Sequence, residues 1–165
     1  MNQLMYREHL IEHYKNPQNY GHIDNPDFKN KEDNPLCGDE IEIEVKFSTA
    51  KERGSTKSKV TTSKVPKIKV TKIKDIKFSG HGCAISQAAA SLMTEHMKGK
   101  NIEDIKKFSR EEMLGLLKVE VTPMRLKCAL LAWNVLQNGL RDDKNIRNVP
   151  QQEIKPHLRN KKDND

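Results

Sequence analysis

The sequence predicts one domain of the mixed α/β class, of α+β type, built around an antiparallel sheet. Residues 40–47 and 67–78 alternate apolar and polar side chains, which is the pattern of strands with one solvated face. Apolar residues at helical spacing lie on both sides of these segments along the chain. With 165 residues, 35% of them hydrophobic and 32% charged, the chain is long enough for one modest core and short for two domains.

The N-terminal segment 2–15 is expected to be a helix that ends before the breaker pair Asn16-Pro17. Its apolar positions include Leu4, Leu10, Ile11 and Tyr14. His9 and His13 stand four residues apart, a spacing that allows two imidazoles to bind one metal ion. Such a pair needs further ligands nearby, so a solvated helix face is the favoured interpretation. Residues 17–39 are rich in Pro, Asn, Asp and Gly, which predicts a loop with one short strand.

The two predicted strands are expected to pair through a long connection. In the first strand Glu42, Glu44 and Lys46 fall on the solvated face, opposite the isoleucines. In the second strand Ile73 breaks the alternation, which indicates a β-bulge. The connection at 48–66 is almost devoid of apolar residues, so we expect a basic, mobile hairpin insertion at about 49–66.

The positive charge is concentrated in that part of the chain. Residues 51–74 hold nine Lys or Arg against one acid, whereas the rest holds 21 bases and 22 acids (30 − 9 and 23 − 1). A broad basic face is therefore absent from the sequence pattern, which argues against nucleic-acid binding. No apolar run approaches the length of a membrane span and no signal segment is recognisable, so a soluble cytoplasmic protein is expected.

The C-terminal half is expected to be helical. Residues 80–83 turn out of the second strand into a helix at 84–98, which Gly99 ends. Two shorter helices are predicted at 101–107 and 109–117. Thr122-Pro123 is typical of a helix start, and the helix that follows is expected to end at Gly139. The polar residues 141–165 are expected to form a flexible tail.

Three cysteines, Cys37, Cys83 and Cys128, lie 46 and 45 residues apart and cannot all pair in disulfides. Cys83 and Cys128 fall near predicted helix N-termini, where the macrodipole favours thiolate. With Cys37 and Asp39 they would complete a Cys₃Asp set that suits zinc or iron. The residues alone leave alternatives open: Cys128 as a core thiol beside Leu131 and Val135, Asp39 as a turn residue, and His81 as the fourth ligand.

The cysteine motifs resemble those of the U-type iron–sulfur cluster assembly family, which comprises IscU, SufU and the N-terminal domain of NifU. The motifs are NPLCGDEI at 34–41, IKDIKFSGHGCAISQAAASLMTEHMKGK at 73–100 and LKCALLAW at 126–133. The opening YREHLIEHYKNPQNYG at 6–21 is also similar to the family's first helix and its exit. The resemblance covers roughly residues 1–140, which we therefore expect to form the single domain.

The resemblance implies a small three-stranded antiparallel sheet with helices packed on one face and a metal site at one end. It implies Cys37, Asp39, Cys83 and Cys128 as ligands of a transient [2Fe–2S] cluster, with Cys37 as the persulfide acceptor. Implied partners are a cysteine desulfurase and apo iron–sulfur acceptor proteins, so the chain is expected to be a scaffold or sulfur carrier rather than a conventional enzyme. Some members hold Zn²⁺ instead and accept sulfur from the desulfurase.

Two departures from the family bear on this choice. Lys127 stands where IscU-like members have a histidine, as in SufU-like members, yet the spacing of Cys83 and Cys128 is similar to IscU. Residues 121–125 replace the segment that recruits a dedicated chaperone in IscU, so that partner is not expected. Arg125 and Lys127 are candidate auxiliary residues that offset negative charge. A zinc-bound sulfur acceptor is the second hypothesis, and a basic binding module with a structural metal is the remote third.

Overall fold

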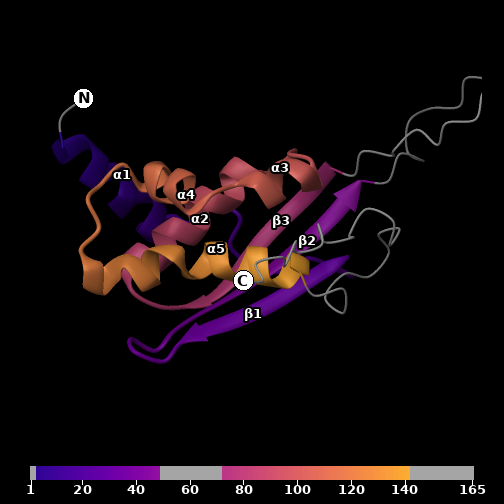
Figure 1. The fold of residues 1–165 in the computed structure, drawn as a ribbon, viewed down its shortest axis with the longest axis horizontal. Coiled ribbons are helices and arrows are strands. Elements are labelled where there is room, and N and C mark those ends of the chain that lie inside the picture. The colour runs from indigo at the N-terminus through magenta and orange to yellow at the C-terminus, as the bar shows by residue number, and fades with distance from the viewer. Residues whose placement is uncertain (1–2, 49–71, 142–165) are drawn as a thin grey trace, which may run out of the picture.

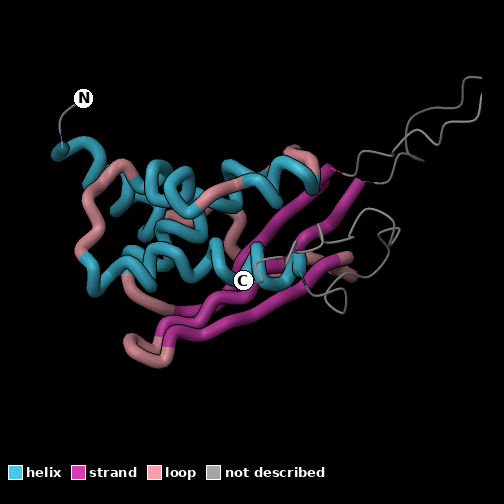
Figure 2. The backbone as a smooth tube through the Cα atoms, viewed as in Figure 1, coloured by secondary structure: helices cyan, strands magenta, loops and turns pink. Residues whose placement is uncertain are grey.

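A computed structural model describes residues 3–48 and 72–141, which form the α+β fold predicted from the sequence (Figures 1 and 2). The predicted insertion at 49–66 and the predicted tail beyond residue 141 lie outside the described residues. The elements run α1 (Gln3–Lys15), β1 (Phe28–Asn34), β2 (Asp39–Ser48), β3 (Lys72–His81), α2 (Ala84–Met97), α3 (Ile102–Lys107), α4 (Arg110–Leu117) and α5 (Leu126–Arg141). No helix in the described part is both long and apolar enough to cross a membrane.

The three strands form one antiparallel sheet in the order β1-β2-β3. At one end Asn34 pairs with Asp39 and Glu40 pairs with His81. At the other end Lys46 pairs with Asp75 but Phe47 pairs with Ile73, so the register shifts by one residue. This shift confirms the bulge that the sequence predicts at Ile73.

The helices gather on one side of the sheet, as Figure 1 shows. Helix α5 packs on β1 and β2, α2 packs on β3, and α1 and α4 pack against α2. The core between these layers contains the inward side chains of the strands and the small residues of α2, among them Ile41, Ile43, Val45, Ile76, Phe78, Ala88, Ala89 and Met93. The run of alanines lets α2 lie close to the sheet, as the small-residue pattern suggests.

Two predicted boundaries are wrong for the same reason, since both depend on a glycine that serves close packing. Helix α5 continues past Gly139 to Arg141. A Cβ at Gly139 would lie 2.5 Å from the Phe28 ring, so this glycine allows α5 to approach β1. Strand β3 continues through Gly80 to His81 instead of ending at 78, and Gly80, at φ +130°, lies against the backbone of Glu40.

Helix α1 buries only part of its apolar surface, and the solvated face predicted for its histidines is wrong at His13. Leu10 is buried, but Leu4, Ile11 and Tyr14 are exposed. His13, expected on a solvated face, is only 8% exposed, and its Nδ1 lies 2.8 Å from the Ser91 hydroxyl of α2. Helix α1 therefore packs on α2 through a polar contact as well as an apolar one.

The predicted solvated face of β2 is wrong at Glu44, which is buried with 4% exposure. Its carboxylate accepts hydrogen bonds from the Ile23 N–H (2.6 Å) and from Lys29 Nζ (2.9 Å), and it lies 3.3 Å from His22 Nδ1. Burial favours the neutral form, but the hydrogen bonds from Ile23, Lys29 and His22 outweigh it and lower the pKa of Glu44. The buried carboxylate therefore fastens the loop before β1 to the outer face of the sheet.

Replacement of Glu44 by Gln is expected to destabilise the protein at neutral pH by about 1–3 kcal/mol, because the charged acceptor is lost. The pKa of Glu44 is lower in the folded than in the unfolded chain, so its contribution is complete above the ordinary value of 4.5 and is lost as the pH falls through the folded value. Urea unfolding at a series of acidic pH values should show the difference between wild type and variant shrinking. The exposed Glu8→Gln is the control, and a difference that stays constant with pH would contradict the assignment.

Candidate metal centre

The hairpin between β1 and β2 positions the first two candidate ligands. The Cys37 and Gly38 N–H groups donate to the Asn34 carbonyl at 3.2 and 2.8 Å, which closes a tight turn with Gly38 at φ +67°. Cys37 is exposed in this turn. Asp39 is the first residue of β2 and is only 2% exposed.

The junction between β3 and α2 supplies Cys83. This residue is the N-cap of α2 and is half-buried, and its N–H donates to Asp39 Oδ1 at 3.0 Å. Gly82 makes the approach feasible, since a Cβ there would lie 2.5 Å from Ser86 Oγ and 2.9 Å from Asp39 Cγ. The start of α2 is thus fastened directly to the start of β2.

Helix α5 contributes Cys128 at its third position, after a 3₁₀ turn at Pro123–Arg125. Cys128 is 1% exposed, so it is a core thiol by burial, and its neighbours Leu131 and Val135 are buried as well. Its Sγ nevertheless lies 3.1 Å from Cys37 Sγ, and both thiols are free. Cys128 is therefore a core thiol by burial and remains a candidate ligand by its position beside Cys37.

The donor atoms of Cys37, Asp39 and Cys128 all lie within 4.8 Å of one another. Cys83 Sγ is not part of this compact group, although the Cys83 backbone holds the Asp39 carboxylate. Asp39 Oδ2 is buried and has no hydrogen-bond partner within the described chain. A buried oxygen without a partner beside two thiols fits a bound cation of the kind that thiolate and carboxylate ligands hold.

Without a bound cation, burial opposes the ionisation of Asp39 and of Cys128. Burial opposes ionisation of Asp39, but the Cys83 N–H and the nearby side chains of Cys128, Cys83 and Ser86 together lower its pKa. Burial, the Cys37 thiol and Asp39 raise the pKa of Cys128 far above its ordinary value. Burial at this position therefore opposes the thiolate form that a helix N-terminus is expected to favour at Cys128. A bound cation reverses this balance.

The remaining predicted residues lie at the rim. Arg125 is exposed, and the neighbouring Cys83 and Cys128 raise the pKa of its guanidinium. Lys127 is exposed on α5. His81 is exposed at the end of β3 and is not in the compact donor group.

Sequence reasoning missed Asn34, which is buried and donates from Nδ2 to Cys37 Sγ at 2.8 Å. Its Oδ1 accepts the Leu36 N–H at 3.2 Å, which shapes the turn. The signal was present, because Asn before Pro three residues ahead of a cysteine is typical of a side chain that bonds forward to its own turn.

The structure is thus a small α+β domain with a three-stranded antiparallel sheet, helices on one face and a candidate Cys/Asp metal site at one end. Comparison with known sequences assigns this domain to a family. The profile of the NifU-like N terminal domain matches residues 5–56 and 62–149, so the chain belongs to that family, which includes the IscU and SufU proteins.

The individual relatives include both SufU and IscU proteins. The chain is 31% identical to the zinc-dependent sulfurtransferase SufU of Bacillus subtilis (strain 168), over 82% of this chain and 89% of that protein. It is 29% identical to the iron–sulfur cluster assembly scaffold protein IscU of Streptococcus pyogenes serotype M1, over 92% of each. A crystal structure from Fervidobacterium islandicum AW-1, described as a candidate cluster assembly scaffold for the SUF system, is 26% identical. It superposes with a TM-score of 0.60 over 84% of this chain and 98% of that chain.

Replacement of Gly82 by Ala should disturb the centre, because the added methyl group meets Asp39 and Ser86. We expect a loss of stability of about 1–3 kcal/mol from overpacking, together with weaker binding of Zn²⁺ or Co²⁺. Gly115→Ala in α4 is the matched control, since nothing lies within 4 Å of its Cβ and a helical alanine adds about 0.5–1 kcal/mol. Thermal unfolding and metal titration give both readouts. Metal affinity unchanged in Gly82→Ala would contradict the geometry.

Proposed function

We propose that the protein is an iron–sulfur cluster assembly scaffold, which receives sulfur from a cysteine desulfurase and passes a [2Fe–2S] cluster to apo-proteins. The carrying observation is that two separate segments of a NifU-family chain, the β1–β2 hairpin and the start of α5, bring Cys37, Asp39 and Cys128 together at one end of the sheet. Cys83, whose N–H binds Asp39, completes the proposed ligand set. The reduced thiols that this requires are typical of the cytoplasm, which is the proposed location.

The ligand set suits a cargo that must leave. Thiolates hold iron firmly, whereas a carboxylate is a harder ligand that exchanges more readily. Asp39 is the proposed labile ligand, and its Oδ2 is the atom without a partner among the described residues. Four anionic ligands leave a cluster with net negative charge, which Arg125 beside Cys83 and Cys128 offsets, with Lys127 as a second source of positive charge.

Cys37 is the proposed entry point for sulfur, because it is the exposed thiol of the three. As thiolate it attacks the terminal sulfur of the desulfurase persulfide. A new S–S bond forms on Cys37, the old S–S bond breaks, and the desulfurase cysteine departs as thiolate. The transferred sulfur needs two electrons from a reductant before it becomes the sulfide of a cluster.

A zinc-bound sulfur acceptor on the same residues is the second candidate, and one observation favours it. A tetrahedral zinc site with Zn–S bonds of about 2.3 Å has ligand atoms about 3.8 Å apart. The compact group, within 4.8 Å, approaches that size without needing two metal ions. In this case Cys37 would leave the zinc to accept sulfur.

The two candidates separate on anaerobic incubation of the full chain with a cysteine desulfurase, cysteine, ferrous iron and a dithiol reductant. The scaffold predicts a visible iron–sulfur chromophore with two irons and two sulfides per cluster, and its transfer to an apo-ferredoxin. Zinc that stays bound, no chromophore and faster desulfurase turnover would overturn the scaffold in favour of the second candidate. Mass spectrometry without iron should find one added sulfur on Cys37, absent in Cys37→Ser.

Replacement of Asp39 by Ala is expected to slow exchange of the bound metal or cluster, because the labile ligand is removed. The Cys83 N–H also loses its acceptor, so a stability loss of about 1–3 kcal/mol accompanies the change. Asp39→Asn is the matched variant, since an amide oxygen can still accept that hydrogen bond while the anionic ligand is lost. Slow exchange in both variants supports a ligand role, and an effect on unfolding alone would leave Asp39 a turn residue.

A further inference from the structure

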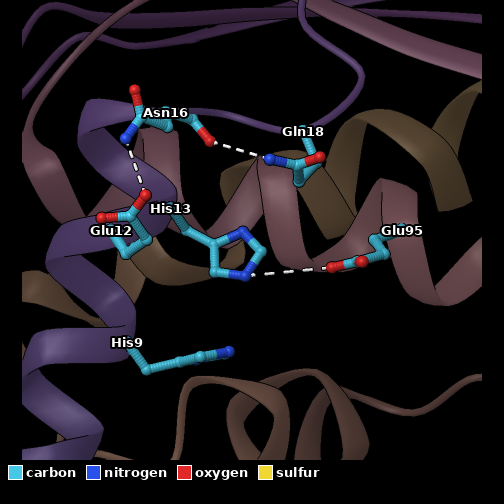
Figure 3. Close-up of a pocket in the computed structure, with 6 residues that line it drawn as sticks. All are labelled: His9, Glu12, His13, Asn16, Gln18 and Glu95. Atoms are coloured by element: carbon cyan, nitrogen blue, oxygen red, sulfur yellow. Dashed lines mark hydrogen bonds and ion pairs between the residues drawn. The ribbon is translucent and has the colours of Figure 1, made fainter.

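Two histidines and two glutamates, side chains of types that can bind metal ions, line a cavity between α1 and the C-terminal part of α2. The cavity has a volume of about 250 Å³ and is lined by His9, Glu12, His13, Asn16, Gln18 and Glu95 (Figure 3). Glu95 follows Cys83 by twelve residues on one helix, which corresponds to about 18 Å. The cavity is therefore separate from the cysteine centre.

His13 is the fixed member of this group. It is 8% exposed, and its Nδ1 lies 2.8 Å from Ser91 Oγ, which also accepts the Gln18 N–H at 2.7 Å. Its Nε2 faces Glu95, with 3.8 Å between Nε2 and the carboxylate. A histidine held at one nitrogen by a hydrogen bond, with the other nitrogen directed into a cavity, has the arrangement of a metal ligand with its outer-shell partner.

His9 lies one helical turn before His13, and the two ring centroids are 4.7 Å apart. Figure 3 shows both imidazoles projecting from α1 toward the side from which Glu95 reaches out of α2. The segment HLIEH at 9–13 has the H-x-x-E-H spacing with which some zinc enzymes bind their metal through two histidines. Glu12 accepts a hydrogen bond from Asn16 Nδ2 at 2.6 Å and is not among the proposed ligands.

We propose that this cavity binds one divalent transition-metal ion of the Zn²⁺ type through His9, His13 and Glu95. Two imidazoles and a carboxylate are donors that Zn²⁺ accepts, and three protein ligands leave one position for water. The side chains of His9 and Glu95 are exposed and can turn toward the buried His13 without disturbing the core.

This proposal is independent of the function of the cysteine centre, and Co²⁺ can test the two sites separately. Co²⁺ bound to thiolates gives intense near-ultraviolet charge-transfer absorption, whereas Co²⁺ bound by imidazole and carboxylate gives only weak d–d bands. The full chain, titrated anaerobically, is expected to take up one Co²⁺ without charge-transfer absorption in addition to any bound by the cysteines. Isothermal titration with Zn²⁺ should show the same second equivalent.

His9→Ala and Glu95→Gln should each weaken this equivalent at least tenfold while leaving the charge-transfer bands unchanged. Both positions are exposed, so the variants are expected to fold. There are two matched controls: His96→Ala, which follows Glu95 in the sequence but lines a different hollow, and Glu12→Gln, a cavity residue already bonded to Asn16. Binding should persist in both.

Nitrogen NMR of the histidine rings gives a second readout, with Zn²⁺ expected to shift Nε2 of His13 and not Nδ1. The proposal is overturned if the second equivalent is absent from the wild-type chain, or if His9→Ala and Glu95→Gln bind it as well as the controls do. Shifts confined to His96 or His22 would place the ion elsewhere and overturn it equally.

Discussion

The hydrogen bond from the Cys83 N–H to Asp39 Oδ1 is the contact on which the centre depends. It joins the first residue of β2 to the N-cap of α2, two points that lie 44 residues apart in the sequence. The β1–β2 turn can present Cys37 toward Cys128 only if Asp39 stays in place, and α2 can pack on β3 only if Gly82 gives it room. One buried carboxylate thus sets both the orientation of a helix and the position of a thiol.

This arrangement places incompatible demands on the metal-free site. Burial raises the pKa of Cys128, whereas hydrogen bonds lower the pKa of the neighbouring Asp39. Ionising Asp39 and the Cys128 thiol together is therefore unfavourable unless a cation is bound between them. A metal ion bound through Cys128 would displace the thiol proton, so its affinity is expected to depend on pH.

The sequence predicted the elements because their signals are local. Alternation identified β2, the phase break at Ile73 identified the bulge, and Thr122-Pro123 marked the start of the 3₁₀ turn that leads into α5. The misses are residues whose role depends on a distant partner. His13 is buried by Ser91, 78 positions away, and Gly139 faces Phe28 across the core. Cysteine spacings of 46 and 45 residues likewise do not say which side chains lie close together, because that depends on how the hairpin, the β3–α2 junction and α5 pack. The ligand set was therefore predicted from the family resemblance and not from the spacing.

Helix α2 gives the two donor groups opposite electrostatic surroundings. Its N-terminus carries the positive end of the macrodipole, which favours an anion, and Cys83 stands there as the N-cap. Its last turn, ending at Met97, carries the negative end and presents Glu95 beside the imidazoles of α1. Thiolates at one end and imidazoles with a carboxylate at the other also differ in softness, so the thiols compete better for soft or thiophilic ions. The same helix therefore gives the cysteine centre and the proposed His/Glu site opposite ends of one macrodipole.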